Sequence, residues 1–396
     1  MVSVEEACRI IFSTLYKPPV ATLPLAEAAG YVLAEPVYAD RDFPPFDRVM
    51  MDGIAVALAR LKAGQRTFAV ETIQPAGTPQ KRLKDVNKCI EVMTGAMLPK
   101  GTDVVIRYED LVINNGEANV QVDTFEACQH IHARGRDVKE EAEILTPGTL
   151  LAPAEIALLA SVGKAEVLVR QLPNVAVIST GNELVDVTDT PELHQIRRSN
   201  SYALSAALKL MGLQSEIHHL PDDKDEMEEG LKRLLNRFDV LILSGGVSKG
   251  KFDFVPETLE KLHVRKLIHR VSQRPGKPFW FGASQEDKIV FALPGNPVST
   301  YLCFYRYIRP WLGLSMGTKV SEWTAVLAED FEFQPSLTCF LQVKVSCEEG
   351  KLWAYPRPGQ GSGDFANLSE VDGFLQLPAE KQEFKRGEAF PYIPFR

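Results

Sequence analysis

The sequence predicts a multidomain protein built around a doubly wound, parallel α/β domain, with β-rich segments before and after it. Two observations carry this prediction. Between residues 174 and 311, apolar stretches of strand length alternate with amphipathic stretches of helix length, which is typical of a parallel sheet covered on both faces. In segments 54–135 and 317–396, short runs rich in β-branched residues are separated by turn residues, which favours β domains.

These patterns divide the 396 residues into domains. From the N-terminus, we expect an N-terminal helix packing on the α/β domain (1–20), a linking domain (21–50 and 136–172), a small inserted β domain (51–135), the α/β domain (173–316) and a C-terminal, barrel-like β domain (317–396).

The N-terminal helix is predicted from residues 4–15, where apolar residues recur at helical spacing. Ser3 is a plausible N-cap, and Lys17-Pro18-Pro19 ends the helix because proline cannot continue it. The first residues carry acids where a signal peptide would carry basic residues, so we expect a cytoplasmic protein.

The α/β domain is predicted from four strand-like runs and four helix-like runs in alternation. The strands are expected at 174–179, 215–219, 239–244 and 289–293. The helices are expected at 201–211, 223–236, 256–262 and 298–311. In the β-rich segments, Asn114-Asn115-Gly116 predicts a turn between strands, and Glu349-Gly350 predicts a hairpin turn.

The composition excludes several classes of function. Net charge is −8, from 44 Lys and Arg against 52 Asp and Glu, and no block of basic residues suggests nucleic-acid binding. No apolar run is long enough for a transmembrane helix, so we expect no membrane partner. The six cysteines form no Cys-x-x-Cys pair, and we interpret them as mostly buried thiols in a reducing compartment.

Three of the predicted strands end in loops that are suited to binding phosphate. These loops are Thr180-Gly181-Asn182-Glu183, the segment from Ser244-Gly245-Gly246 through Ser248 to Asp253, and Pro294-Gly295-Asn296-Pro297. Adjacent glycines let backbone N–H groups approach an oxyanion, and a helix N-terminus favours one too. Because ligands of open α/β sheets bind at the carboxyl ends of the strands, we expect the three loops to form one site.

Charged residues in these loops suggest a metal ion and an anion. Glu183 and Asp253 would repel a phosphate unless a hard cation such as Mg²⁺ lies between them. Arg274-Pro275-Gly276-Lys277-Pro278 is a stiff loop that can present positive charge, although a solvated surface turn would look the same.

Other motifs are absent or less informative. The sequence has no phosphate-binding G-x-x-x-x-G-K-[ST] motif, no dinucleotide-binding G-x-G-x-x-G motif after a strand and no G-x-S-x-G nucleophile elbow. His130 with His132, and His218 with His219, lack a third metal ligand nearby in sequence, so we interpret both pairs as structural.

The motifs, taken in order, resemble the molybdopterin molybdenumtransferase (MoeA) family, which includes the E domain of gephyrin. The resemblance rests on six segments that span nearly the whole chain: Asp42–Asp47 with Met51-Asp52-Gly53, Met93–Pro99, Ser179–Leu184, Ser244–Ser248 with Asp253, Pro275–Pro278 and Leu293–Ser299. It implies elongated homodimers of four domains, with an adenylyltransferase-like α/β domain and an active site shared between subunits.

The resemblance also implies an activity and its participants. Family members insert molybdenum from molybdate into adenylylated molybdopterin, with help from Mg²⁺ or Zn²⁺, and release AMP and molybdenum cofactor. A molybdopterin adenylyltransferase would act upstream as a partner.

By this resemblance, individual residues receive roles. Catalytic positions are Asp52, Thr94, Asp137, Glu183, Asp253 and Lys277, and Glu183 and Asp253 are the metal ligands. Positions that bind substrate are Thr180, Gly181, Asn200, Ser244, Gly245, Gly246, Ser248, Arg274, Pro294, Gly295, Asn296, Pro297 and Ser362.

The chain departs from the family pattern mainly on the molybdate side. Arg274 replaces a lysine, and Ser336-Leu337 replaces a Gly-Arg pair whose arginine contacts molybdate. Val49-Met50, Arg136 and Val371-Asp372-Gly373 also differ from the usual residues. Two alternatives therefore stay open: a nucleotide or pterin pyrophosphatase or adenylyltransferase without molybdate insertion, and a non-catalytic scaffold.

Overall fold

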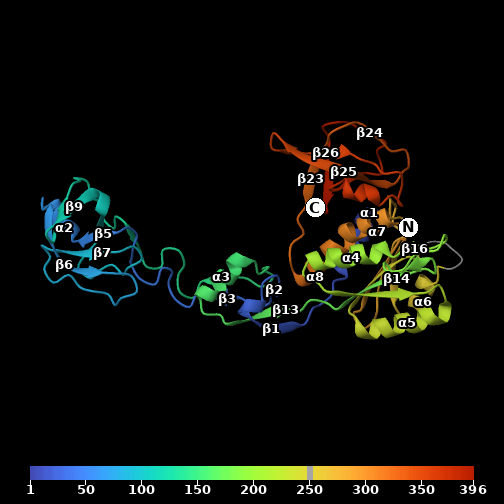
Figure 1. Cartoon of the computed structure of the whole chain (residues 1–396), viewed down its shortest axis with the longest axis horizontal. Helices are drawn as coiled ribbons and strands as arrows, with labels where there is room; N and C mark the ends of the chain where they lie inside the picture. Colours follow the sequence, from blue (N-terminus) through green and yellow to red (C-terminus); the bar gives the residue numbers. More distant parts are fainter. Residues whose placement is uncertain (248–252) are drawn as a thin grey trace.

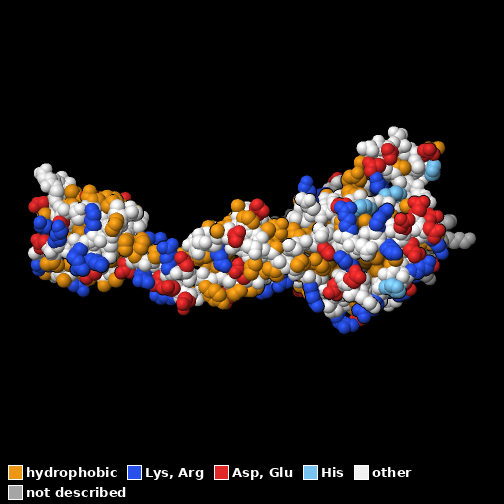
Figure 2. Space-filling model, turned by 90° about the horizontal axis from the view of Figure 1, so that it is seen from below, with side chains coloured by type: hydrophobic (Ala, Val, Ile, Leu, Met, Phe, Trp, Pro, Cys, Tyr) orange, Lys and Arg blue, Asp and Glu red, His pale blue; other side chains and the backbone are white. Residues whose placement is uncertain are grey.

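The chain is elongated in the computed structural model, which describes residues 1–247 and 253–396. The small β domain lies at one end, the linking domain in the middle, and the α/β and C-terminal domains together at the other end (Figure 1). On the face seen in Figure 2, basic and acidic side chains are interspersed along the whole length. No helix in the described part of the chain combines the length and apolar character needed to cross a membrane.

The N-terminal helix packs against the α/β domain. Helix α1 (Val4–Ser13) begins at Ser3, whose Oγ accepts a hydrogen bond from the backbone N–H of Glu6 at 3.1 Å, as the sequence predicts for an N-cap. Its buried face shares a hydrophobic core with the central sheet and with Trp311, whose indole N–H donates to the carbonyl of Thr14 at 2.8 Å.

The linking domain is assembled from two distant stretches of chain. Its three-stranded sheet has the order β1-β13-β2, formed by β1 (Val20–Pro24), β13 (Glu166–Arg170) and β2 (Val32–Leu33). The remaining elements are η1 (Leu25–Glu27), β3 (Val37–Tyr38) paired with β12 (Glu143–Leu145), and α3 (Pro153–Ser161). The pair β4 (Arg48–Val49) and β11 (Ile131–His132) leads into the small β domain.

The small β domain is a six-stranded sheet with the order β8-β5-β7-β6-β10-β9. Its elements are β5 (Gly53–Val56), α2 (Leu58–Lys62), β6 (Thr67–Gln74), β7 (Cys89–Val92), β8 (Val104–Arg107), η2 (Tyr108–Asp110), β9 (Leu111–Asn114) and β10 (Glu117–Val120). The predicted turn at Asn114-Asn115-Gly116 is confirmed: Asn115 and Gly116 have φ of 50° and 79°, and they join the antiparallel strands β9 and β10 as a hairpin.

The central sheet of the α/β domain has the order β17-β14-β18-β22-β21-β19. Its four predicted strands are parallel: β14 (Val175–Thr180), β17 (Ser215–Leu220), β18 (Val240–Ser244) and β22 (Ile289–Leu293). Two strands that we did not expect, β19 (Arg265–His269) and β21 (Trp280–Ala283), extend the sheet as antiparallel neighbours. The sheet is therefore mixed at one edge.

Helices cover both faces of this sheet, as predicted for a doubly wound fold. Alternate residues of β14 face opposite cores: Val175 and Val177 face one, and Ala176 and Ile178 face the other. The first core is covered by α1, α4 (Ser199–Leu210), α7 (Pro297–Cys303), the π-helical turn η3 (Phe304–Ile308) and α8 (Arg309–Met316). The second is covered by α5 (Lys224–Arg237) and α6 (Val255–Lys261).

The C-terminal domain is a closed five-stranded barrel. The strands are β23 (Trp323–Leu327), β25 (Thr338–Glu348), β26 (Lys351–Pro356), β27 (Gly373–Leu377) and β29 (Ala389–Pro394), and pairing of β25 with β27 closes the ring. The predicted turn at Glu349-Gly350 is confirmed by positive φ angles of 51° and 76° between β25 and β26. The short strands β20 (Gln273–Arg274), β24 (Phe331–Glu332) and β28 (Glu383–Phe384) and the turn η4 (Ala366–Ser369) lie outside the ring.

Candidate functional site

The three predicted loops meet at a single cavity of about 880 Å³. They follow β14, β18 and β22, which are neighbours in the sheet, so their carboxyl ends open at the same edge. The lining includes the predicted residues Thr180, Gly181, Glu183, Asn200, Ser244, Gly245, Gly246, Asp253, Pro294, Gly295, Asn296 and Pro297. Ser248, also predicted to contact substrate, lies outside the described residues.

The backbone of the second loop lies very close to Thr180. Gly245 has φ of +105°, and a Cβ added there would lie 2.7 Å from both the carbonyl oxygen and Oγ1 of Thr180. A larger residue is therefore excluded by contact as well as by backbone strain. The glycine lets two strand-ending loops close around one small volume.

Two hydroxyl groups in the cavity wall are left for a ligand. Thr180 is 4% exposed and Ser201 is fully buried, and neither hydroxyl has a hydrogen-bond partner among the described residues. Buried polar groups without partners are costly, and they are usually satisfied by water or by a ligand. Both residues line the cavity, although each hydroxyl oxygen is itself buried.

Asn200 holds two of the three loops together through hydrogen bonds of its side chain. From the first turn of α4, its side-chain Nδ2 donates to Ser244 Oγ at 2.8 Å and to the carbonyl of Gly295 at 2.7 Å. This amide therefore ties the end of β18 to the loop that follows β22.

Three carboxylates interact at the cavity, one more than the sequence predicted. Glu183, Asp222 and Asp253 all line it. Burial raises the pKa of Asp222, and the negative charges of Glu183 and Asp253 raise it further. Asp222 follows β17, the fourth parallel strand, so the rule about strand ends could have identified it.

These carboxylates fit a metal ion that is shared with the ligand. Segments 1–247 and 253–396 contain no group of three or more His, Cys, Asp or Glu residues that could hold a metal ion, so a metal here would need ligands from the substrate or from water. Mg²⁺ commonly uses one or two carboxylates together with substrate phosphate and water. The described lining contains no His or Cys, the ligands that structural zinc sites prefer, so the residues fit Mg²⁺ better than Zn²⁺.

A second cavity of about 520 Å³ adjoins the first, between the α/β domain and the barrel. The two cavities share Pro278, Pro294 and Asn296 as lining residues. The predicted residues Arg274, Lys277 and Ser362 line the second cavity. Ser362 Oγ accepts a hydrogen bond from Asn296 Nδ2 at 2.8 Å, so the C-terminal domain is tied directly to the loop that follows β22.

The loop Arg274–Pro278, which lines the second cavity, is held in place by a buried polar network. Gln273 is fully buried, and its Nε2 donates to the carbonyls of Pro275 at 3.1 Å and Gly276 at 3.3 Å. The hydroxyl of Tyr307 donates to Gln273 Oε1. Arg274 and Lys277 are exposed, and no described carboxylate lies within ion-pair distance of either. Their charge is available to an oxyanion.

Replacing Gly276 by Ala should disturb this loop. Gly276 has φ of +88°, and an added Cβ would lie 2.6 Å from Gln273 Nε2 and 2.9 Å from Cys303 Sγ. We expect the free energy of unfolding to fall by about 2 kcal/mol, which thermal unfolding would detect as a Tm lowered by several degrees. Gly212→Ala is the matched control, since Gly212 has φ of +80° but nothing within 4 Å of the added Cβ. Equal Tm losses in the two variants would contradict the packing argument.

Leu337 makes this second cavity more apolar than the resemblance implies. It lines the cavity with Phe331, Phe333 and Leu341, at the position where the family pattern has an arginine. Arg274 and Lys277 are therefore the two cations among the described lining residues.

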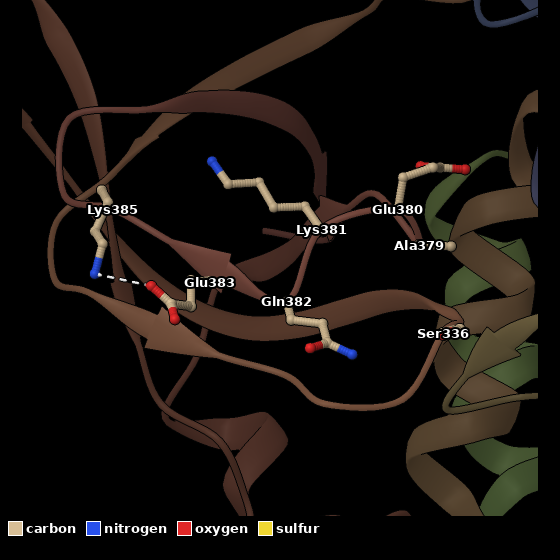
Figure 3. Close-up of a pocket in the computed structure, with 7 residues that line it drawn as sticks. All are labelled: Ser336, Ala379, Glu380, Lys381, Gln382, Glu383 and Lys385. Carbon is tan, nitrogen blue, oxygen red and sulfur yellow. Dashed lines mark ion pairs between the residues drawn. The ribbon is translucent and has the colours of Figure 1, made fainter.

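A third cavity, of about 850 Å³, lies beside β28 in the C-terminal domain (Figure 3). Unlike Arg274 and Lys277 in the second cavity, its cationic side chains form ion pairs. Its lysines already have partners: Lys385 pairs with Glu383 at 3.5 Å and with Asp330 at 3.3 Å, and Lys381 pairs with Glu388 at 2.5 Å. This cavity therefore offers an anion less free positive charge than the loop at Arg274 and Lys277.

The other predicted catalytic residues lie far from these cavities. Asp52 Oδ1 accepts hydrogen bonds from the backbone N–H and the hydroxyl of Thr94 at 2.6 and 2.7 Å, and these bonds lower the pKa of Asp52. Asp137 pairs with His132 Nε2 at 2.8 Å. Asp52 precedes β5 and Thr94 follows β7, in the small β domain at the opposite end of the chain (Figure 1). One chain does not bring the two groups of residues together.

Comparisons with known proteins show similarity over the full length of the chain. Three family models match the chain: the MoeA N-terminal region (domain I and II) over residues 2–163, a probable molybdopterin binding domain over 176–313, and the MoeA C-terminal region (domain IV) over 324–395. A molybdopterin molybdenumtransferase from Synechocystis is 40% identical over 396 residues, covering 99% of each chain. One from Staphylococcus epidermidis is 30% identical over 400 residues, covering 99% of this chain and 95% of the relative.

A solved structure shows the same fold over the full length. The crystal structure of the molybdopterin biosynthesis MoeA protein from Pyrococcus horikoshii superposes with a TM-score of 0.84 at 27% identity, covering 100% of both chains. With the full-length identity to the Synechocystis protein, this match shows that the chain belongs to the molybdopterin molybdenumtransferase (MoeA) family.

Proposed function

We propose that this protein transfers molybdenum from molybdate to adenylylated molybdopterin, releasing AMP and forming molybdenum cofactor. Membership of the family supports a role in molybdenum cofactor biosynthesis. The observation that carries the finer proposal is the contact between two unlike cavities. One has phosphate loops and three carboxylates, the other has cations without a described acidic partner, and Pro278, Pro294 and Asn296 line both.

In this proposal the first cavity holds the phosphoanhydride that joins AMP to molybdopterin. The hydroxyls of Thr180 and Ser201 donate hydrogen bonds to phosphate oxygens, and Gly245 allows the backbone to approach them. Glu183 and Asp253 would supply carboxylate ligands for Mg²⁺, and substrate phosphate and water would complete its coordination. When bound, Mg²⁺ neutralises charge that develops as the bond to AMP breaks. Cleavage of this kind depends on positioning and charge neutralisation more than on a covalent intermediate.

The second cavity would hold molybdate. Arg274 and Lys277 form no ion pair with a described carboxylate, although Glu332 lines the same cavity, so a divalent oxyanion gains their attraction without displacing an existing ion pair. Asn296, which lines both cavities, fixes molybdate beside the phosphate loops. The adenylylated substrate would come from a molybdopterin adenylyltransferase.

We also propose that the active site is completed by a second copy of the chain in a homodimer. Asp52 and Thr94 form a rigid, hydrogen-bonded pair in a domain that cannot reach the cavities of its own chain in this conformation. A neighbouring subunit arranged by twofold symmetry could bring its pair to the cavity.

The transferase proposal is tested by following AMP release and cofactor formation from adenylylated molybdopterin and Mg²⁺, with and without molybdate. We expect AMP release to depend on molybdate and to be accompanied by active cofactor. Leu337 favours one competing activity, pyrophosphate cleavage without molybdenum insertion, because it removes a cation from the second cavity. AMP release at the same rate without molybdate would support that activity and contradict the transferase.

A further inference from the structure

Two exposed apolar side chains stand at the rim of the otherwise polar first cavity. Ile196 is 58% exposed and Phe365 is 56% exposed, and both line the cavity. They come from different domains: Ile196 begins β16 (Ile196–Arg197) in the α/β domain, and Phe365 precedes η4 in the C-terminal domain. Among the described lining residues, Phe365 is the single aromatic side chain.

The backbone around Phe365 is well anchored although its ring is exposed. The carbonyl of Phe365 accepts from the N–H of Leu368 at 3.0 Å. Nearby, Asp364 Oδ2 accepts from the N–H of Gln360 at 2.9 Å, and Asn367 Nδ2 donates to the carbonyl of Arg357 at 2.7 Å. Within residues 1–247 and 253–396, no other aromatic ring packs against Phe365. A large apolar ring held in this way toward water has no evident role in the core.

Ile196 is hydrogen-bonded to the backbone of the loop that carries Glu183. Its backbone N–H donates to the carbonyl of Glu183 at 2.8 Å, and β16 pairs with β15 (Leu184–Val185) beside that residue. The same cavity is therefore lined by three carboxylates, by the strand-ending loops and by two exposed apolar side chains. A ligand with phosphates at one end and a flat ring at the other matches that combination of surfaces.

We propose that Phe365 stacks on a planar heteroaromatic ring of the bound substrate, with Ile196 as a second apolar contact. The inference rests on the proposed function, whose substrate carries two such rings, adenine and pterin. Stacking on an aromatic side chain needs only the flat face of the ring, so Phe365 contributes affinity rather than chemistry.

The test compares AMP with ribose 5-phosphate, which lacks the base, by calorimetry in the presence of Mg²⁺. We expect Phe365→Ala to weaken AMP binding at least about fivefold and to leave ribose 5-phosphate binding unchanged. Phe365→Tyr keeps the ring face and should restore AMP affinity. Trp323→Ala is the matched control, because Trp323 is 54% exposed on β23 and does not line the cavity.

The outcomes separate the two rings and the two proposals. If Phe365→Ala leaves AMP affinity unchanged but raises KM for adenylylated molybdopterin, with Phe365→Tyr restoring it, Phe365 stacks on the pterin. If Phe365→Ala changes neither quantity, the stacking inference is wrong while the proposed function stands. A wild-type protein that binds neither AMP nor ribose 5-phosphate would contradict the proposed function itself. Unchanged Tm in Phe365→Ala excludes a general loss of structure.

Discussion

Glu183→Gln and Asp253→Asn should each lower the rate of molybdenum transfer at least about 100-fold, because each removes a carboxylate that the bound metal requires. Both substitutions keep the size of the side chain and remove its charge. In the structure the two carboxylates act on Asp222, whose pKa is raised first by burial and then by their charges. Their mutual repulsion is relieved by a cation, and each amide variant therefore weakens the binding of that cation.

The measurement is kcat for AMP release at several Mg²⁺ concentrations. We expect the amide variants to need more Mg²⁺ and to recover only part of the rate at saturation. Glu229→Gln is the control, since Glu229 is exposed on α5 and lies outside the cavity. If either amide variant turned over at the wild-type rate with unchanged Mg²⁺ dependence, the metal assignment would be wrong.

Local patterns predicted the loops of the first cavity because they depend on short-range rules. Continuous apolar strands ending in glycine were sufficient to place Thr180, Ser244 and Gly295 at one edge of a sheet. The turn at Asn115-Gly116 could be predicted for the same reason. An Asn-Gly pair favours positive φ angles whatever the rest of the fold, and both residues have positive φ angles in the structure.

Two features of the cavities were not predicted, Asp222 because helix capping already explains its acidic segment, and the Gln273 network because it joins distant residues. Asp222 lies in the acidic run before α5, where Asp223 is the N-cap and accepts hydrogen bonds from the N–H groups of Asp225 and Glu226. Because helix capping adequately explains the acidic residue Asp223, the adjacent Asp222 was not recognised as a cavity residue. The network of Gln273 and Tyr307 joins residues 34 positions apart, and no local spacing indicates it.

The antiparallel strands β19 and β21 were missed for a related reason. Arg265–His269 spans only five residues and shows no alternation, since two basic residues are followed by Leu267 and Ile268, and Trp280–Ala283 is shorter still. Their strand conformation is stabilised by pairing with β22 and with each other, which only the folded sheet provides.

A heterodimer with Asp52→Asn in one subunit and Asp253→Asn in the other should recover about half of the wild-type activity, although either homodimer is nearly inactive. If the site is shared, one cavity in this heterodimer has intact Asp253 and receives intact Asp52 from its partner. The other cavity carries both substitutions. The amide oxygen introduced by Asp52→Asn can still accept the hydrogen bonds from Thr94, so the small β domain should keep its structure.

The reciprocal heterodimer makes this test decisive. It pairs a wild-type chain with a chain that carries both substitutions, and two different affinity tags allow it to be purified free of homodimers. A shared site predicts that this heterodimer is nearly inactive, because each cavity lacks one of the two carboxylates. A site contained in one chain predicts the opposite pattern: half activity here, and none when the substitutions are in different subunits. The separation of Asp52 from Asp253 along the elongated chain leads us to expect the first pattern (Figure 1).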